Sequence, residues 1–303
     1  MNLTNLSEVR ALMDEFQIHF QKKFGQNFLI NPTVPKRIAA YAARGVLEIG
    51  PGIGTLTREL CQTAEKVVAV EIDRGLIPVL EKTLGEFENV KILNQDILKV
   101  NLPALIQEEF GDLPVSVCAN LPYYITTDIL MALLESKIPF ASITVMVQKE
   151  FAQRICAGAG TADYGAITAS VSYYARAEKL FDVPPGNFVP APKVTSSVLM
   201  LTPYQTPPVT VTEEAMLFAV IRAAFAQRRK TLQNALSTAF PKAQKERLAN
   251  CIAAAGYAPS IRGEMLPLSA FAALANALTE AGISCACNGG ISSQNSVENV
   301  KKS

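Results

Sequence analysis

The feature that most constrains the fold is a pattern that residues 45–123 repeat four times. A short apolar run, typical of a buried strand, ends in glycine or in polar residues and leads into a stretch with helical character. Such alternation predicts an open α/β fold, a doubly wound sheet of parallel strands. The carboxyl ends of those strands meet at one edge of the sheet, where ligands bind in this architecture.

The first repeat carries a glycine-rich turn. The apolar run 45–49 leads into Gly-Pro-Gly-Ile-Gly and then into a helix through about Cys61. At Gly50 and Gly52 the backbone can approach a ligand closely, and the start of the helix favours negative groups. A dinucleotide-binding fingerprint would require glycine where Thr55 stands, which counts against a nicotinamide-dependent oxidoreductase.

The second and third repeats each end in a carboxylate. Glu71 lies at the end of the run 66–72, where an acidic residue can accept hydrogen bonds from both hydroxyls of a ribose. Asp96 follows the run 90–93 and is a candidate acceptor for the amino group of an adenine. The alternatives are a strand-end carboxylate facing water for Glu71 and a helix cap or turn for Asp96.

The fourth repeat ends in Asn120-Leu121-Pro122-Tyr123. Asparagine offers a carbonyl acceptor and tyrosine a flat aromatic face, while proline ends the pairing of the strand. Together these groups can hold the exocyclic amine of a planar base. The alternative is an ordinary loop that turns at Pro-Tyr.

The N-terminal part combines an amphipathic helix at 5–20 with an irregular segment at 21–32. This segment mixes basic, amide and aromatic residues, as a lid over a site or a nucleic-acid contact does. The alternative is a linker between helices whose phenylalanines are buried in the core.

The C-terminal part begins after a proline-rich loop at 188–197, a strand at 198–201 and a linker at 202–208. From about 212 the pattern is helical. Its basic cluster is a candidate contact for phosphates, with solvated helix surface as the alternative. The cluster consists of Arg222, Arg228, Arg229 and Lys230. From 283 the sequence is polar and aperiodic, which predicts a disordered tail.

Composition limits the function classes. The 303 residues are 49% hydrophobic and 18% charged, which suits a globular protein with one large and one small domain. One histidine argues against a histidine-based triad or metal site, so we expect no metal. Six cysteines without a C-x-x-C pair, no leader and no long apolar run favour a cytoplasmic protein without a membrane contact.

Charge is distributed unevenly along the chain. Basic residues exceed acidic ones in 1–45 and in 205–282, whereas acidic residues dominate 46–204. Basic ends around an acidic centre suit a protein that holds a polyanion at its edges and a charged small molecule in the middle.

These motifs resemble those of the ribosomal RNA adenine dimethyltransferase family. The resemblance covers about residues 15–282. The segments that carry it are FGQNFL at 24–29, EIGPGIGTLT at 48–57, EID at 71–73, QD at 95–96, NLPY at 120–123, FVPAPKV at 188–194 and FAQRRKTL at 225–232. The resemblance implies a class I S-adenosylmethionine-dependent methyltransferase domain at 1–204, with the N-terminal helix and lid at 1–31. It also implies a small all-α RNA-binding domain at 205–282.

The resemblance also implies residue roles. Asn27 and Leu29 would close over S-adenosylmethionine and Gly50, with Gly52 in the same turn, would lie beside its methionine portion. Glu71 would hold the ribose, Asp96 would meet the adenine and Asn120 would lie between cofactor and target. We expect the Asn120 side-chain oxygen and the Leu121 or Pro122 carbonyl to accept the two N–H bonds of the target amine, with Tyr123 stacked on the base.

The substrate implied by the resemblance is 16S rRNA in the small (30S) ribosomal subunit, with two adjacent adenosines dimethylated on N6 near the 3′ end by a monomeric enzyme. The related erythromycin-resistance enzymes act on 23S rRNA, but Leu121 and the form of the 188–194 loop favour the small-subunit branch. A ribosome-assembly factor without catalytic activity is a further alternative.

Overall fold

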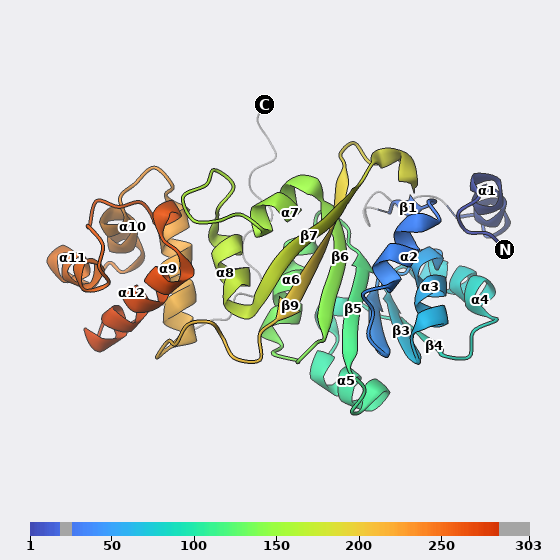
Figure 1. Cartoon of the computed structure of the whole chain (residues 1–303), viewed down its shortest axis with the longest axis horizontal. Helices are drawn as coiled ribbons and strands as arrows, with labels where there is room; N and C mark the ends of the chain where they lie inside the picture. Colours follow the sequence, from blue (N-terminus) through green and yellow to red (C-terminus); the bar gives the residue numbers. More distant parts are fainter. Residues whose placement is uncertain (19–25, 285–303) are drawn as a thin grey trace. The chain divides into compact units, whose positions relative to one another are not determined.

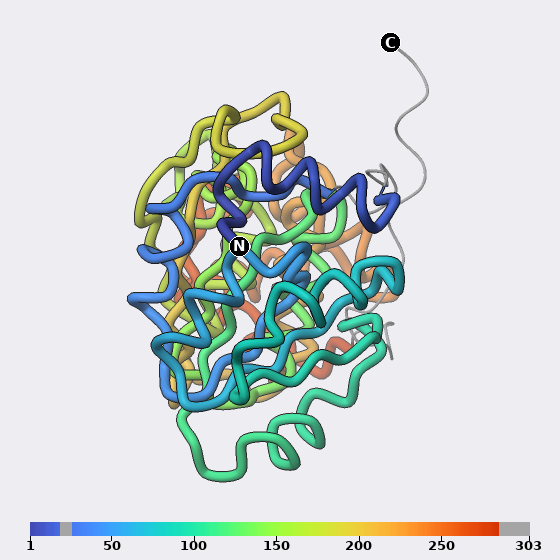
Figure 2. Tube along the Cα trace, turned by 90° about the vertical axis from the view of Figure 1, so that its right-hand side faces the viewer, coloured from blue at the N-terminus to red at the C-terminus, as the bar shows by residue number. Residues whose placement is uncertain are grey.

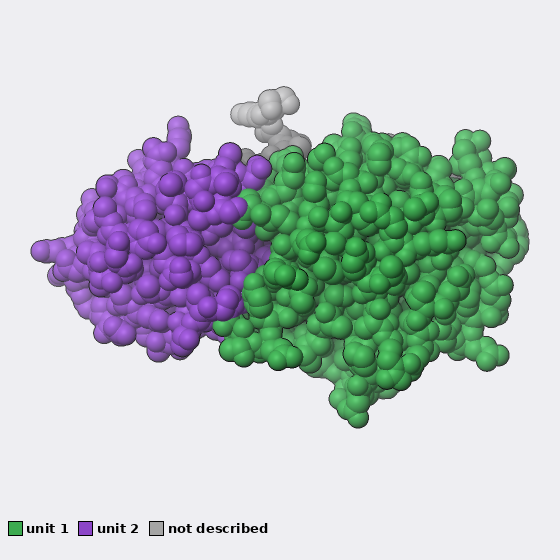
Figure 3. Space-filling view, viewed as in Figure 1, with its two compact units in different colours: residues 1–157, 174–207 green, residues 158–173, 208–303 purple. Residues whose placement is uncertain are grey.

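The computed structural model describes residues 1–18 and 26–284, which form two compact units (Figure 3). The first unit contains residues 1–157 and 174–207, and the second contains 158–173 and the chain from 208. This division differs from the predicted boundary at 204/205, because the segment 158–173 packs with the helical unit. There the Tyr164 hydroxyl donates a hydrogen bond of 2.9 Å to the Leu266 carbonyl. Phe24, Gly25 and nearly all of the predicted tail lie outside the described residues.

A seven-stranded sheet forms the centre of the first unit (Figure 1). Five strands are parallel, and the sheet order is β4-β3-β2-β5-β6-β9-β7 with the last two antiparallel to their neighbours. The parallel strands are β2 (Gly45–Ile49), β3 (Lys66–Glu71), β4 (Val90–Asn94), β5 (Val115–Asn120) and β6 (Ser142–Gln148). The predicted doubly wound sheet is therefore confirmed. The strand order reverses at β2, which places a ligand crevice at the carboxyl ends of β2, β3 and β5.

Helices cover the sheet and connect its strands. They are α2 (Thr33–Ala39), α3 (Thr55–Thr63), α4 (Ile77–Leu84), α5 (Leu102–Phe110), α6 (Thr126–Glu135) and α7 (Lys149–Ile155). Helices α2 and α3 bury their apolar stripes on one face, where Ile38 and Leu60 pack in one cluster with Val46 and Val67. Burial on both faces explains why β2, β3, β5 and β6 consist mostly of apolar residues.

Two antiparallel strands complete the sheet, β9 (Ser196–Pro203) and β7 (Ala175–Val183). Sequence analysis expected β9 but not β7. Strand β7 lies at the edge of the sheet and leaves four of its side chains exposed, so its sequence has neither the apolar run nor the regular alternation of a typical strand. An irregularity between Lys179 and Phe181 further disturbs its period.

The N-terminal part of the chain packs at the side of this unit. Helix α1 (Leu6–Glu15) is shorter than the predicted 5–20, and the Asn5 side chain caps it. Its apolar residues pack on Leu76 of η2 (Arg74–Leu76) and on Val79 of α4. The trace of α1 lies at the surface of this unit (Figure 2). Strand β1 (Phe28–Leu29) then pairs antiparallel with β8 (Phe188–Val189), which follows η4 (Pro185–Asn187).

The second unit is helical, as predicted. Its helices are α9 (Glu214–Ala226), α10 (Leu232–Ala239), α11 (Lys245–Ala254) and α12 (Leu268–Glu280), with η5 (Gly263–Met265) and most of α8 (Ala166–Tyr174). Phe271 is fully buried at its centre, with its ring centroid 6.0 Å from that of Phe225. Among the described residues of both units, no helix has the length and apolar character needed to cross a membrane.

Candidate active site

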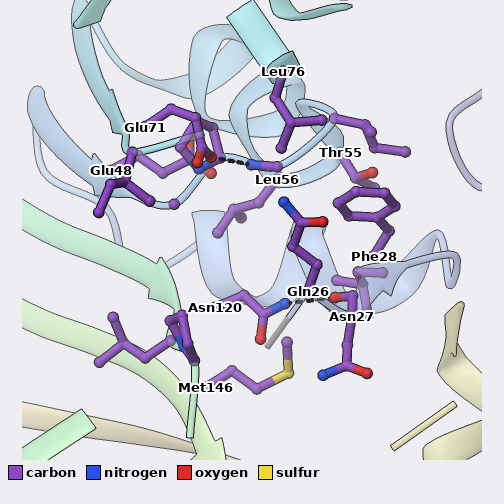
Figure 4. A pocket seen from close by; sticks show the side chains of 18 of the residues that line it. Gln26, Asn27, Phe28, Glu48, Thr55, Leu56, Glu71, Leu76, Asn120 and Met146 are labelled. Atoms are coloured by element: carbon purple, nitrogen blue, oxygen red, sulfur yellow. Dashed lines mark hydrogen bonds between the residues drawn. The ribbon is translucent and has the colours of Figure 1, made fainter. Parts of the chain in front are cut away.

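An open cavity lies at the predicted sheet edge (Figure 4). Its walls come from the ends of β2, β3 and β5, from the glycine turn and from β1. Residues predicted from distant parts of the sequence meet here. They are Asn27, Leu29, Gly50, Gly52, Glu71, Asn120, Leu121, Pro122 and Tyr123.

The glycine turn brings bare backbone to the cavity wall. Gly50 and Gly52 have φ angles of +68° and +62°, in the left-handed region that side chains disfavour. A Cβ at Gly50 would meet no atom within 4 Å, so the space beside it is open to a ligand. Helix α3 begins directly after this turn. The N–H groups of its first turn, which have no partner within the helix, therefore point toward the cavity side of the turn.

Glu71 closes the end of β3 and is only 4% exposed. Its carboxylate accepts hydrogen bonds from the backbone N–H of Asp73 at 2.8 Å and of Gly52 at 3.2 Å. Burial raises the pKa of Glu71 to about 7, although these backbone hydrogen bonds oppose the shift. A buried carboxyl group at the wall of the cavity is well placed to accept hydrogen bonds from hydroxyl groups of a ligand.

Glu48 lies in β2 and also lines the cavity, although it was not predicted as a site residue from the sequence. It is 1% exposed, and its Oε2 has no hydrogen-bond partner among the described residues. Burial raises the pKa of Glu48 to about 8, the Thr57 side chain opposes the shift, and the charge of Glu71 adds to it. A carboxyl group inside an apolar run directly before a glycine turn was a signal that could have revealed this residue.

Asn120 is oriented by a distant part of the chain. Its side-chain Nδ2 donates a hydrogen bond of 3.0 Å to the backbone carbonyl of Asn27 (Figure 4). Because a carbonyl can only accept, the amide must present its nitrogen to Asn27. The opposite end of the amide, Oδ1, is therefore left as an acceptor without a donor among the described residues.

The two backbone carbonyls after Asn120 differ in their contacts. The Pro122 carbonyl accepts hydrogen bonds from the Thr126 hydroxyl at 2.9 Å and from the Ile125 N–H at 3.3 Å. Within the described part of the chain, no donor reaches the Leu121 carbonyl. Of the two carbonyls predicted as acceptors, Leu121 therefore has the available lone pairs.

Tyr123 is held toward the antiparallel side of the sheet. Its hydroxyl lies 2.8 Å from the Ser196 hydroxyl at the start of β9. Burial raises the pKa of the Tyr123 phenol, so the group is neutral at physiological pH. Ser196 belongs to the loop that sequence analysis marked at 188–197, but its contact with Tyr123 was not predicted.

The segment that contains Asn27 and Leu29 is attached on two sides. Strand β1 pairs with β8, while the Gln26 Nε2 donates a hydrogen bond of 2.8 Å to Asp73 near the end of β3. Phe28 and Leu29 are each 5% exposed and line the cavity. The segment forms a wall of the cavity, consistent with the lid interpretation, and its phenylalanine is buried, as the alternative expected.

Asp96 differs from the other predicted site residues. It is not among the residues that line the cavity, and its Oδ1 accepts the Leu98 N–H at 3.1 Å at the start of η3 (Ile97–Lys99). This is the cap that sequence analysis kept as the alternative. Asp96 nevertheless lies at the end of the strand next to β3, since the Gln95 N–H donates to the Glu71 carbonyl at 3.0 Å.

The predicted basic cluster divides into two kinds of residue. Arg228 makes an ion pair of 2.9 Å with Glu264 and donates to the Ala162 carbonyl, so it holds the 158–165 loop to η5. The exposed side chains of Arg222, Arg229 and Lys230 make no hydrogen bond or ion pair with described residues.

The family model for "Ribosomal RNA adenine dimethylase" matches residues 17–257, most of the chain. The chain belongs to this family. Two relatives named "Ribosomal RNA small subunit methyltransferase A" are 49% identical, from Lachnoclostridium phytofermentans, and 46% identical, from Alkaliphilus metalliredigens. The first match covers 89% of this chain and 95% of the relative, and the second covers 88% and 95%.

Two solved structures resemble this chain over most of its length. A dimethyladenosine transferase from Plasmodium falciparum superposes with a TM-score of 0.71 at 25% identity, over 84% of this chain and 98% of that one. The 23S rRNA methyltransferase ErmE superposes with a TM-score of 0.62 at 27% identity, over 84% of this chain and all of that one.

Adenine dimethylases depend on S-adenosylmethionine, and the cavity has groups that suit this ligand. The open space beside Gly50 suits the methionine portion of the ligand, which would pass close to the backbone there. The Glu71 carboxylate suits the hydroxyl groups of the ribose. The unpaired Oε2 of Glu48 is a buried polar atom that lacks a partner within the described residues, as expected of an atom that contacts a ligand.

Proposed function

We propose that this adenine dimethylase transfers methyl groups from S-adenosylmethionine to N6 of two adjacent adenosines of 16S rRNA in the small ribosomal subunit. The observation that carries the proposal is the orientation of Asn120. Its amide nitrogen is engaged by Asn27, so its oxygen is available as an acceptor in the cavity. An acceptor is what a primary amine with two N–H bonds requires.

In this proposal the donor lies against the glycine turn and the end of β3. Gly50 and Gly52 provide close backbone approach, and the Glu71 carboxylate accepts hydrogen bonds from the ribose hydroxyls. Asn27 and Leu29 cover the donor from the N-terminal side. When bound, S-adenosylmethionine supplies an electrophilic methyl group on its sulfonium sulfur.

The protein activates the target amine through hydrogen bonds. The lone pair on N6 of adenine is delocalised into the ring, which makes the amine a weak nucleophile. Asn120 Oδ1 and the Leu121 carbonyl accept its two N–H bonds and thereby favour a localised lone pair directed at the methyl group. Tyr123, held by Ser196, stacks on the base and aligns it for in-line transfer.

No general base is required in this scheme. The methylated ammonium is strongly acidic and loses its proton to water, so a catalytic histidine is unnecessary. The part played by the protein is to position the amine and to exclude competing geometries.

The RNA must present an unstacked adenosine, which suits a loop of ribosomal RNA. We assign Arg222, Arg229 and Lys230 of the helical unit to phosphate contacts. Arg228 was predicted as a fourth contact, and its ion pair with Glu264 favours a structural role instead. The four described cysteines are free thiols, which supports the proposed cytoplasmic location. We propose that the protein acts as a monomer.

The proposal is tested with purified protein, labelled S-adenosylmethionine and under-methylated small and large ribosomal subunits in parallel. We expect label in N6,N6-dimethyladenosine from small subunits alone. Label from large-subunit RNA would assign the protein to the resistance enzymes acting on 23S rRNA. Binding of S-adenosylmethionine without transfer to either subunit would identify an assembly factor.

A further inference from the structure

Two large apolar side chains at the rim of the cavity are exposed. Tyr124 is 60% exposed and Ile72 is 48% exposed, and both line the cavity. Apolar surface that continues from a cavity wall is typical of a ligand-binding rim.

The position of Ile72 indicates which part of a ligand this rim faces. Ile72 directly follows Glu71, the residue that we assign to the ribose. The base of a nucleoside is attached to its ribose, so the base of a ligand held at Glu71 must lie in the adjoining space. Asp96 lies beside this space, because β4 is the neighbour of β3 in the sheet.

Tyr124 lines the cavity, and α6, the helix that follows it, contacts η3, which begins directly after Asp96. Burial raises the pKa of the Tyr124 phenol, and the negative charge of Asp96 raises it further, so the two groups are within electrostatic reach of each other. The turn before α6 is anchored by the two hydrogen bonds to the Pro122 carbonyl. The backbone at Tyr124 is therefore held in place, while the ring of Tyr124 is exposed.

The two adjacent tyrosines face different neighbours. Tyr123 contacts Ser196 on β9, the antiparallel side of the sheet, whereas Tyr124 lies near Asp96 on the β4 side. The first side is where we place the target base, and the second is where we place the nucleoside of the methyl donor.

We propose that Tyr124 is a binding residue for the methyl donor, and that its ring covers the adenine of the bound donor opposite Ile72. The proposal rests on the proposed function, because it requires that Glu71 holds the ribose of this donor. A purine stacks well on an aromatic face, and Asp96 beside it accepts a hydrogen bond from an amino group.

The chain contains no tryptophan, which makes a direct test possible. The variant Tyr124→Trp carries a single indole at the cavity rim. We expect S-adenosylhomocysteine, added without RNA, to change its fluorescence as the purine stacks on it. The matched control is Tyr41→Trp, because Tyr41 is 41% exposed and does not line the cavity. Its fluorescence should not respond. An unresponsive indole at 124, in a variant that still binds the ligand by calorimetry, would overturn the proposal.

Affinity provides the second measurement. Loss of one stacking partner weakens binding roughly ten-fold. We expect Tyr124→Ala to raise the Kd for S-adenosylhomocysteine about ten-fold, Tyr124→Phe to stay within about three-fold of wild type, and the KM for small subunits to be unchanged. Unchanged ligand affinity with a raised KM for RNA would show that the ring contacts the substrate and would overturn the proposal. Failure of the wild-type protein to bind the donor would instead overturn the proposed function, and the inference with it.

Discussion

The side-chain amide of Asn120 donates a 3.0 Å hydrogen bond to the backbone carbonyl of Asn27, 93 residues earlier in the chain. This contact joins the end of β5 to the segment before β1 and leaves the amide oxygen of Asn120 available in the cavity. The N-terminal segment is therefore part of the arrangement that orients the proposed catalytic amide, in addition to its proposed role in covering the donor.

The first prediction concerns Asn120 itself. We expect Asn120→Ala to lower kcat at least about 100-fold, the scale for losing one positioned hydrogen-bonding group at a reaction centre. Methyl transfer to under-methylated small subunits measures kcat, and thermal unfolding confirms that the variant is folded. Turnover within a few-fold of wild type would contradict the assignment.

The aspartate variant refines this test. Asn120→Asp keeps the shape of the side chain but places a carboxylate oxygen against the Asn27 carbonyl, where it has no proton to donate. We therefore expect Asn120→Asp to lose activity comparably to Asn120→Ala. High activity of the aspartate variant would show that the contact with Asn27 is unimportant.

The second prediction concerns the attachment of the N-terminal segment. Gln26 donates a hydrogen bond of 2.8 Å to Asp73. Gln26→Ala removes the donor, and Gln26→Glu places a second carboxylate beside the first. We expect the Kd for S-adenosylmethionine to rise a few-fold in the alanine variant, on the scale of about 1 kcal/mol for one hydrogen bond, and further in the glutamate variant. Equal affinity of both variants and wild type would show that this attachment does not affect the cavity.

The third prediction concerns pH. Burial raises the pKa of Glu48 to about 8, well above the ordinary glutamate value of 4.5. Between these two values the folded protein binds more protons than the unfolded chain, so the contribution of Glu48 makes stability fall as pH rises. Below about pH 4.5 both states are protonated and the contribution is constant.

The variant Glu48→Gln removes this titration while keeping the shape of the side chain. We expect the unfolding free energy of the variant, relative to wild type, to increase from pH 5 to pH 8. Thermal or urea unfolding across this range, in the absence of ligand, measures the difference. A difference independent of pH would show that Glu48 is already ionised at pH 5.

The fourth prediction separates the members of the basic cluster. Replacing Arg229 and Lys230 with alanine should weaken RNA binding and reduce the salt dependence of binding by about 0.7–0.9 in log–log slope for each lost phosphate contact. Protein stability should be unchanged, since neither side chain makes a hydrogen bond or ion pair with another described residue.

Arg228→Ala is the matched comparison. Arg228 makes an ion pair with Glu264 and donates a hydrogen bond to the Ala162 carbonyl. We therefore expect Arg228→Ala to lower the free energy of unfolding by about 1 kcal/mol, with little change in the salt dependence of RNA binding. A reduced slope for Arg228→Ala would restore it to the set of RNA contacts. An unchanged slope for the double variant would show that Arg229 and Lys230 are ordinary surface residues.

Much of the fold was predictable because its information is local. Strands β2, β3 and β5 are buried on both faces, so their apolar runs and polar ends are visible in the sequence. Parallel strands joined by helices then place Gly50, Glu71 and Asn120 at one edge, as the structure confirms. Strand β7 was not predictable in this way, since an exposed edge strand needs no apolar period.

The sequence alone determined which chemical groups stand at the ends of the strands and therefore which family of reactions the chain can support. It did not determine which groups touch. The contact of Asn27 with Asn120, the burial of Glu48 beside Glu71 and the ion pair of Arg228 with Glu264 each depend on packing between segments distant in sequence. Local periodicity indicates which side of its helix or strand a residue occupies. The contact partner of that residue, its charge state and its access to a ligand depend on the surfaces that folding packs against it.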